Sequence, residues 1–309
     1  MELLRKVVVL LTLSFGLSLP ALAADPPKDL VLKNDARCTT CHDEADAPEL
    51  LAIGKTRHGV TADGRTPSCT NCHGESKAHV EHKGKDKPPK PDVSFNRGTK
   101  NAPEQRNGAC LECHQGGNRM HWASSSHAGN DVTCSTCHKI HNQHDKSRSK
   151  AEQTEVCFSC HKSQRADAHK ASHHATLEGK VACSSCHNPH GSTGPRMLVK
   201  NTINETCYMC HTEKRGPFLW EHPPAADNCM NCHTPHGSNH PALLKTRQPY
   251  LCQQCHDFTQ HPGNPYSGRG LPASAGGTAP AQQLLLRACA NCHTQVHGSN
   301  HPSGVRQTR

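Results

Sequence analysis

The chain has 309 residues, of which 33% are hydrophobic and only 3% are aromatic, less apolar material than a compact domain of this length normally buries. This composition excludes a conventional core of packed side chains. The formal net charge of +9 would by itself indicate binding to nucleic acid or to an acidic membrane, but the 20 cysteines and 27 histidines indicate metal or cofactor chemistry first.

Residues 1–23 have the pattern of a secretory signal peptide. Arg5 and Lys6 form a basic start, the segment 7–19 is apolar, and the segment 21–23 reads Ala-Leu-Ala, a small-residue cleavage site. The apolar stretch is too short to span a bilayer, so we expect export of a mature chain that begins near Ala24. The mean hydropathy of −0.75 agrees with a soluble exported protein.

All 20 cysteines fall into ten copies of one motif, CxxCH, and none is left over. The cysteine pairs are Cys38 and Cys41, Cys69 and Cys72, Cys110 and Cys113, Cys134 and Cys137, Cys157 and Cys160, Cys183 and Cys186, Cys207 and Cys210, Cys229 and Cys232, Cys252 and Cys255, and Cys289 and Cys292. The motif histidines are His42, His73, His114, His138, His161, His187, His211, His233, His256 and His293. CxxCH is the attachment signature of c-type haem, in which the thiols form thioethers and the histidine binds the iron. We therefore expect ten covalently bound c-type haems, which would fill the interior.

Three other uses of CxxC pairs fit less well. A disulfide framework or zinc sites built from grouped pairs give no reason for a histidine directly behind every pair. A redox-active pair of the thioredoxin type lacks its βαβ context. Each oxidised haem would add two negatively charged propionates and one net positive charge on its ferric porphyrin, so ten haems would cancel the formal +9 and leave the holoprotein near neutral. No nucleic-acid partner is therefore expected.

Seventeen histidines lie outside the motifs, and their placement divides the chain into five two-haem modules. In every module a histidine follows the second motif, and in four modules another precedes it by 7 to 11 residues. In the fifth, a Gly/Pro-rich insertion at 262–280 displaces the leading histidine. The expected second iron ligands are His58, His79, His127, His141, His174, His190, His222, His236, His261 and His297. Ten candidates for ten irons predict bis-histidine ligation throughout.

The other histidines have no regular place. His82, His121, His144, His169 and His173 are interpreted as exposed or as contacts to propionates. The sequence HGSNHP occurs at 236–241 and again at 297–302. By this comparison His240 corresponds to His301, and His297 is preferred over His301 as the ligand.

In CSSCHNPHG, His187 and His190 lie three positions apart. Opposite axial ligands need Cα atoms roughly 12 to 13 Å apart, for metal–nitrogen bonds of about 2 Å by analogy with zinc. Three extended residues reach only about 10 to 11 Å. The two histidines are therefore expected to serve different haems, with His190 on the far face of a neighbour.

The expected fold is a multihaem cytochrome c, with short helices and loops around an extended haem stack and little or no sheet. A helix is expected around 152–160. First cysteines from Cys134 to Cys252 are 22 to 26 residues apart, which suits a column of haems in sequence order. The basic, Pro-rich segment 83–95 is interpreted as a solvated loop, with a partner-docking loop as the alternative. Residues 24–309 would form one continuous decahaem domain.

Several segments carry a family resemblance: NETCYMCHTEKRGPFLWEH at 204–222, LCQQCH at 251–256, CHNPHG at 186–191 and QVHGSNHPSG at 295–304. Across 37–304 the chain resembles the periplasmic decahaem cytochromes of porin-cytochrome conduits, the MtrA, MtoA and PioA type, related to the DmsE proteins. The resemblance implies a haem wire inserted in an outer-membrane β-barrel porin. Its implied partners are periplasmic or inner-membrane cytochromes and, further out, an outer-surface multihaem cytochrome or an extracellular mineral.

The expected function is electron transfer rather than catalysis, across the outer membrane for iron oxidation or metal reduction. One alternative is a soluble electron donor to a periplasmic reductase, which needs the same haems but no porin. The less favoured alternative is a multihaem reductase. Such an enzyme needs an iron with an open position, whereas every motif here ends in histidine and ten spare ligands match ten irons.

Overall fold

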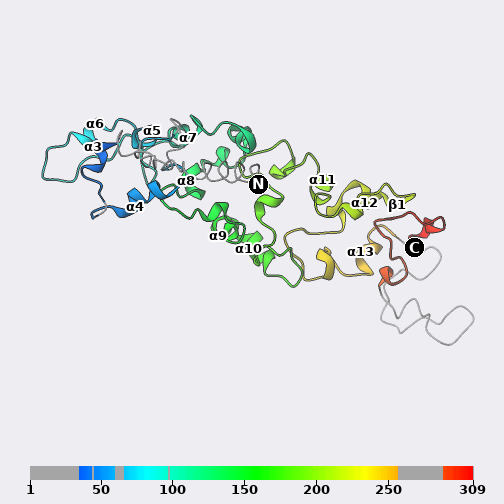
Figure 1. The fold of residues 1–309 in the computed structure, drawn as a ribbon. Helices are drawn as coiled ribbons and strands as arrows, with labels where there is room; N and C mark the ends of the chain where they lie inside the picture. Colours follow the sequence, from blue (N-terminus) through cyan, green and yellow to red (C-terminus); the bar gives the residue numbers. More distant parts are fainter. Residues whose placement is uncertain (1–34, 44, 60–65, 97, 257–287, 309) are drawn as a thin grey trace, which may run out of the picture.

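The computed structural model describes residues 35–43, 45–59, 66–96, 98–256 and 288–308. The predicted signal peptide, the insertion at 262–280 and His261 lie outside these described residues. The described chain is elongated, with its N-terminal third toward one end, residues 150–170 in the middle and its C-terminal third toward the other end (Figure 1). This arrangement agrees with the expected extended stack.

The secondary structure consists of short helices joined by loops. The α-helices are α3 (Ala36–Thr39), α4 (Pro48–Leu51), α5 (Cys69–His73), α6 (Lys77–Val80), α7 (Pro103–Leu111), α8 (Cys134–Cys137), α9 (Gln153–Phe158), α10 (Lys162–Ala168), α11 (Ile203–Cys207), α12 (Pro223–Asp227) and α13 (Tyr250–Gln253). The 3-10 helices are Ala52–Lys55, Gly117–Arg119, Trp122–Ser124, Ala128–Asn130, Lys146–Arg148, Cys183–Ser185, Pro195–Met197, Thr212–Lys214, Cys229–Asn231, Pro241–Leu243, Cys289–Asn291 and Gly304–Arg306. Strands β1 (Trp220–Glu221) and β2 (Gly298–Ser299) pair antiparallel. The predicted fold class is confirmed, including the helix expected around 152–160. Within the described ranges, no helix is both long and apolar enough to cross a bilayer.

The two motifs of a module lie in different local structures. The first motif begins near the end of an α-helix, as at Cys110 in α7 and Cys207 in α11. The second motif forms a helical turn of its own. In α5, the Asn71 N–H donates to Ser68 Oγ at 3.4 Å and the Ser68 N–H donates to Asn71 Oδ1 at 2.8 Å. A residue before the first cysteine and one between the cysteines thus cap the turn that presents the thiols.

A polar side chain just before the first motif joins the two motifs of each module. Its oxygen accepts a hydrogen bond from a backbone N–H at the start of the second motif. The pairs are Asp35 and Cys69 (2.9 Å), Asn107 and Cys134 (2.9 Å), Gln153 and Ser184 (2.9 Å), Asn204 and Cys229 (2.8 Å), and Gln248 and Ala290 (3.0 Å). The five modules predicted from histidine placement are therefore also five hydrogen-bonded units.

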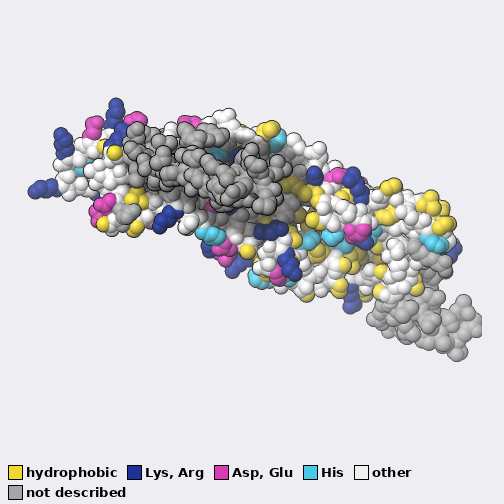
Figure 2. Space-filling view, viewed as in Figure 1, with side chains coloured by type: hydrophobic (Ala, Val, Ile, Leu, Met, Phe, Trp, Pro, Cys, Tyr) yellow, Lys and Arg dark blue, Asp and Glu magenta, His cyan; other side chains and the backbone are white. Residues whose placement is uncertain are grey.

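Few apolar side chains are buried in the described part of the chain. They are Ala47, Trp122, Ala168 and Ala182. Instead of an apolar core, a cavity of 5170 Å³ extends along the molecule and is lined from Arg37 to Thr308. On the surface, lysine and arginine side chains gather at the narrow end formed by the N-terminal part of the described chain (Figure 2).

Candidate haem-binding sites

Each CxxCH motif forms one helical turn that directs its reactive side chains to the same side. The backbone N–H of the motif histidine donates to the carbonyl of the first cysteine, for example His138 to Cys134 at 2.9 Å and His293 to Cys289 at 2.8 Å. Residues i, i+3 and i+4 of such a turn are neighbours on one face. Two thiols and one imidazole therefore converge at every motif, as covalent haem attachment requires.

Nine motif histidines face a histidine from elsewhere in the chain. The facing rings and the distances between their centroids are His42 and His79 (6.0 Å), His58 and His114 (5.9 Å), His73 and His141 (6.2 Å), His127 and His161 (6.1 Å), His138 and His190 (6.1 Å), His174 and His211 (6.4 Å), His187 and His236 (6.1 Å), His222 and His256 (5.9 Å), and His233 and His297 (6.1 Å). Every described histidine expected from sequence to be a second ligand takes part in one of these pairs.

The ring separations fit a metal ion between each pair. Two metal–nitrogen bonds of about 2 Å each, together with the depth of two imidazole rings, account for centroids 5.9 to 6.4 Å apart. His187 and His190, three residues apart, belong to different pairs, with His236 and His138. We number the sites 1 to 10 after their motifs.

The pairing follows a regular order. The histidine that precedes the second motif of a module, its leading histidine, faces the first motif of the next module, as His58 faces His114. The histidine that follows the second motif of a module, its trailing histidine, faces the second motif of the preceding module, as His190 faces His138. In module 1 the trailing His79 instead faces the first motif of its own module. Facing pairs therefore link neighbouring modules to one another.

Hydrogen bonds at the second ring nitrogen orient many of these histidines. Nδ1 lies 2.6 to 3.0 Å from a backbone carbonyl oxygen in eight of them. The pairs are His73 with Val93, His79 with Pro89, His127 with Pro189, His141 with Leu50, His174 with Pro235, His187 with Arg196, His222 with Val296, and His233 with Ala242. His293 has the same contact with Arg306, at 2.7 Å. A carbonyl accepts the Nδ1 proton and leaves the Nε2 lone pair for a metal.

His138 differs, because its Nδ1 faces a carboxylate. Asp145 Oδ2 lies 2.7 Å from this nitrogen and Ser147 Oγ lies 2.9 Å from it. Burial raises the pKa of Asp145, but hydrogen bonds from His138 and Ser147 outweigh burial and leave that pKa below its usual value. Asp145 is therefore ionised at neutral pH.

Burial also affects the pKa of six of the facing histidines. It is the largest cause that lowers the pKa below its usual value in His58, His73, His114, His190, His236 and His297. A lowered pKa keeps the imidazole neutral, and neutral imidazole is the form that binds a metal.

The lining and the volume of the cavity show whether a haem can fit at each motif. It is lined by all ten motif histidines and by nineteen of the twenty cysteines. Shared among ten motifs, its volume is about 517 Å³ each, within the range of about 300 to 1,000 Å³ typical of cofactor pockets. The residues present therefore fit a haem at each motif, with two thiols and a motif histidine at every site and, among the described residues, a facing second histidine at nine of the ten.

First cysteines of the two motifs in a module lie side by side. A hydrogen bond between their thiols lowers the pKa of Cys134 to about 7 and raises that of Cys110. The same relationship joins Cys157 with Cys183 and Cys207 with Cys229. Once haem is attached these sulfurs are thioethers, so what persists is the proximity of the two sites.

Between modules, the second cysteines are neighbours. Burial first, and then the charge of Cys113, raises the pKa of Cys72. Burial and then the charge of Cys160 likewise raise the pKa of Cys137. The pKa of Cys186 is raised in the same way beside Cys210, and that of Cys232 beside Cys255. Sites adjacent in sequence are thus adjacent in space from site 1 to site 9.

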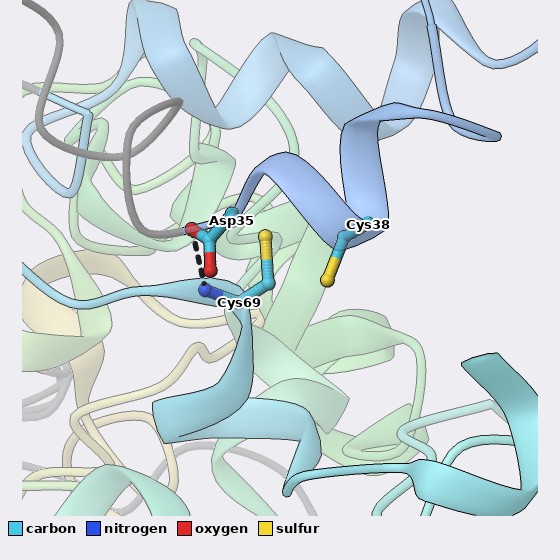
Figure 3. A group of neighbouring side chains, drawn as sticks. All are labelled: Asp35, Cys38 and Cys69. Atoms are coloured by element: carbon cyan, nitrogen blue, oxygen red, sulfur yellow. Dashed lines mark hydrogen bonds between the residues drawn. The ribbon is translucent and has the colours of Figure 1, made fainter. Parts of the chain in front are cut away.

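Asp35, Cys38 and Cys69 form a compact cluster whose ligand atoms lie within 4.8 Å of one another. Asp35 accepts its hydrogen bond from the Cys69 N–H, beside the two sulfur atoms (Figure 3). Both cysteines belong to CxxCH motifs, so haem attachment consumes their thiols. The cluster therefore joins two haem sites and is not a separate metal centre.

The structure separates His297 from His301, and it gives varied positions to the five histidines that have no regular place in the sequence. His297 lines the cavity, whereas His301 is exposed and its Nδ1 lies 2.8 Å from Ser303 Oγ. His82, His121 and His173 also line the cavity, while His144 and His169 are exposed. Sequence reasoning missed Asp145 and the Nδ1 acceptors. It also missed the module-joining side chains, whose only sequence signal is a polar residue three or four positions before the first motif.

The segment 83–95 also has a role that its composition did not predict. Its Pro89 carbonyl contacts His79 and its Val93 carbonyl contacts His73, so it supports sites 1 and 2. Its lysines remain exposed to solvent, which agrees with the solvated-loop interpretation.

Comparison with known proteins places these features in a family. Residues 173–216 and 222–261 match the doubled CXXCH motif, and residues 69–153 match the cytochrome c-type protein NrfB-like family. The chain is 46% identical over 272 residues to the multiheme cytochrome MtrA of Shewanella baltica (strain OS185), covering 86% of this chain and 79% of the relative. It is also 28% identical over 137 residues to the cytochrome c-type protein NrfB of Escherichia coli O6:H1 (strain CFT073), covering 42% of this chain and 67% of the relative.

The doubled-motif matches join site 6 to site 7 and site 8 to site 9, across the boundaries between our modules. These are the sites whose second cysteines are neighbours. Covalent c-type haem at CxxCH and electron transfer rather than catalysis both follow from the motifs and from the extent of the MtrA match. The chain belongs to the MtrA family of multihaem c-type cytochromes.

Proposed function

We propose that residues 24–309 form one continuous domain that binds ten haems, with each iron between a motif histidine and a second histidine. The observation that carries this proposal is the set of nine facing rings with centroids 5.9 to 6.4 Å apart. The order of pairing, continued to module 5, assigns His261 to site 10. Bis-histidine ligation at every site leaves no open iron for catalysis.

Haem supplies one-electron redox chemistry when bound. The chain's own residues determine where that chemistry occurs. CxxCH turns fix each attachment point, carbonyl acceptors fix the histidine tautomers, and neighbouring cysteines hold consecutive sites next to one another. Together these residues arrange the sites as one continuous wire.

The cellular role proposed is transfer of electrons across the outer membrane. The chain would act from the periplasm, inserted in an outer-membrane β-barrel porin. It would exchange electrons with periplasmic or inner-membrane cytochromes on one side and with an outer-surface multihaem cytochrome or a mineral on the other. The elongated shape, the order of the sites and the match to an MtrA support this role.

Haem content and ligation can be measured on the purified holoprotein. Intact mass should give ten haems per chain, and a Cys157→Ala, Cys160→Ala double variant should carry one fewer. Electron paramagnetic resonance of the oxidised protein should show low-spin iron only, and the reduced protein should not bind carbon monoxide. A substantial high-spin signal in the wild type would overturn bis-histidine ligation and favour the reductase alternative.

The porin partner can be tested in the native host with an affinity-tagged full chain. Detergent-solubilised outer membranes should yield a stable complex with a β-barrel protein, while a tagged soluble periplasmic cytochrome should not. Intact membranes should protect the chain from added protease. Recovery of the chain only as a free periplasmic protein would overturn the porin proposal and support the soluble-donor alternative.

A further inference from the structure

Site 4 has a feature that sets it apart from the other second-motif sites. In sites 2, 6, 8 and 10 the motif histidine presents Nδ1 to a neutral backbone carbonyl. In site 4 the His138 Nδ1 proton points to the Asp145 carboxylate at 2.7 Å. A single charged acceptor thus replaces the neutral one at this position of the repeat.

Asp145 is held firmly in this position. Its Oδ1 accepts hydrogen bonds from the Ser147 hydroxyl at 2.8 Å and from the Ser147 N–H at 3.1 Å. Its side chain is only 15% exposed. Among the ion pairs of the described residues, Asp145 has no lysine or arginine partner, and Lys146 pairs with Glu155 instead. The negative charge is therefore directed at His138 and is weakly screened.

A carboxylate at this distance changes the iron site through the histidine. It draws the Nδ1 proton toward itself and so makes Nε2 a stronger donor to the metal. A stronger donor and a nearby negative charge both favour ferric over ferrous iron, because the ferric form carries one more positive charge. Neutral carbonyls exert a smaller effect of the same kind.

We propose that Asp145 is a positioning residue that sets the reduction potential of site 4 below those of sites 2, 6, 8 and 10. This inference rests on the proposed ligation of site 4 by His138 and His190. Since site 4 lies in the interior of the wire, it would hold an electron less often than its second-motif counterparts. The low-potential site would then divide the wire into two segments, sites 1 to 3 and sites 5 to 10.

Redox titration of the holoprotein, followed by electron paramagnetic resonance and visible spectra, tests this inference. Asp145→Asn keeps the shape of the side chain and removes its charge. In this variant one component among ten should move upward, with its ratio of reduced to oxidised iron rising about tenfold at a given potential, or about 59 mV for one electron. The matched control is Asp131→Asn, which removes an exposed carboxylate from the same module and should leave every component in place.

Two further variants keep the test decisive if Asp145→Asn is poorly assembled. Asp145→Glu retains the charge and should keep the component near its wild-type potential. Ser147→Ala loosens Asp145 and should move the same component upward by less than Asp145→Asn does. An unchanged titration in Asp145→Asn or in Ser147→Ala, or a uniform shift of all components, would overturn the inference. High-spin iron in the wild type would instead overturn the ligation on which it rests.

Discussion

Asp35 Oδ2 accepts a hydrogen bond from the backbone N–H of Cys69 at 2.9 Å, and this bond joins the two motifs of module 1 across 34 residues. Asp35 is fully buried, and its other oxygen, Oδ1, has no hydrogen-bond partner among the described residues. The equivalent positions of modules 2 and 4 hold asparagines, Asn107 and Asn204. Module 1 thus carries a buried acidic side chain at the position where modules 2 and 4 carry a neutral amide.

Asp35→Asn should therefore stabilise the holoprotein. The amide oxygen can keep the bond to Cys69, while the cost of an unsatisfied buried carboxyl oxygen, about 1 to 3 kcal/mol, is reduced. Denaturant unfolding followed by visible and far-ultraviolet spectra would measure the change. The reverse substitution at the matched position, Asn107→Asp, should destabilise by a similar amount. A destabilised Asp35→Asn would indicate that the carboxyl group has a partner that an amide cannot replace.

His261 should be the second ligand of site 10. The order of pairing places trailing His79 opposite His42 within module 1, and the mirror arrangement in module 5 predicts leading His261 opposite His293. His261→Ala should make one haem in ten high-spin and allow one carbon monoxide to bind per reduced chain. His240→Ala, at a histidine outside the facing pairs, is the control. Low-spin iron at every site in His261→Ala would show that another residue binds there.

His297, and not His301, should bind iron at site 8. The His297 ring faces His233 at 6.1 Å, whereas the His301 Nδ1 lies next to Ser303. His297→Ala is expected to open one haem to carbon monoxide, and His301→Ala is expected to leave all ten closed. Carbon monoxide difference spectra of the two reduced variants make the comparison directly. Carbon monoxide binding by His301→Ala, and not by His297→Ala, would reverse the assignment.

Loosening the segment 83–95 should disturb sites 1 and 2 together. Asp92 anchors this segment, since its Oδ2 accepts from the Ser76 N–H at 2.7 Å and its own N–H donates to Ser76 Oγ at 3.1 Å. Asp92→Ala should weaken the support of His79 and His73, so that the reduced protein binds carbon monoxide slowly at no more than two sites. Lys87→Ala, at an exposed lysine of the same segment, should bind no carbon monoxide. Uptake at more than two sites would show that the effect spreads beyond the loop.

Without haem the chain should not fold. The buried apolar residues of the described chain are three alanines and Trp122, and ordering each residue costs about 1 to 2 kcal/mol in backbone entropy. Expression without haem attachment should give an expanded chain with little helix, as measured by circular dichroism and small-angle scattering. A cooperative thermal transition in this apo form would contradict the view that the cofactors form the core.

The sequence predicted well what depends on local chemistry. CxxCH needs only one helical turn, so the attachment points could be read from spacing, and the regular position of His190 or His236 marked them as candidates. It did not predict which site each candidate faces, because His190 reaches His138 only through the packing of neighbouring modules. Asp145 was missed for the same reason, since a short polar segment gives no sign that its carboxylate meets a haem histidine.

The exchange of histidines between modules also limits how such a chain can change in length. If module 3 were removed, His127 would meet the motif of His211 and His236 would meet the motif of His138, so every remaining pair could form again. Loss of a single motif would break this matching and leave a histidine without its counterpart. Deletion or duplication during evolution would therefore preserve the wire only when it adds or removes two haems at a time.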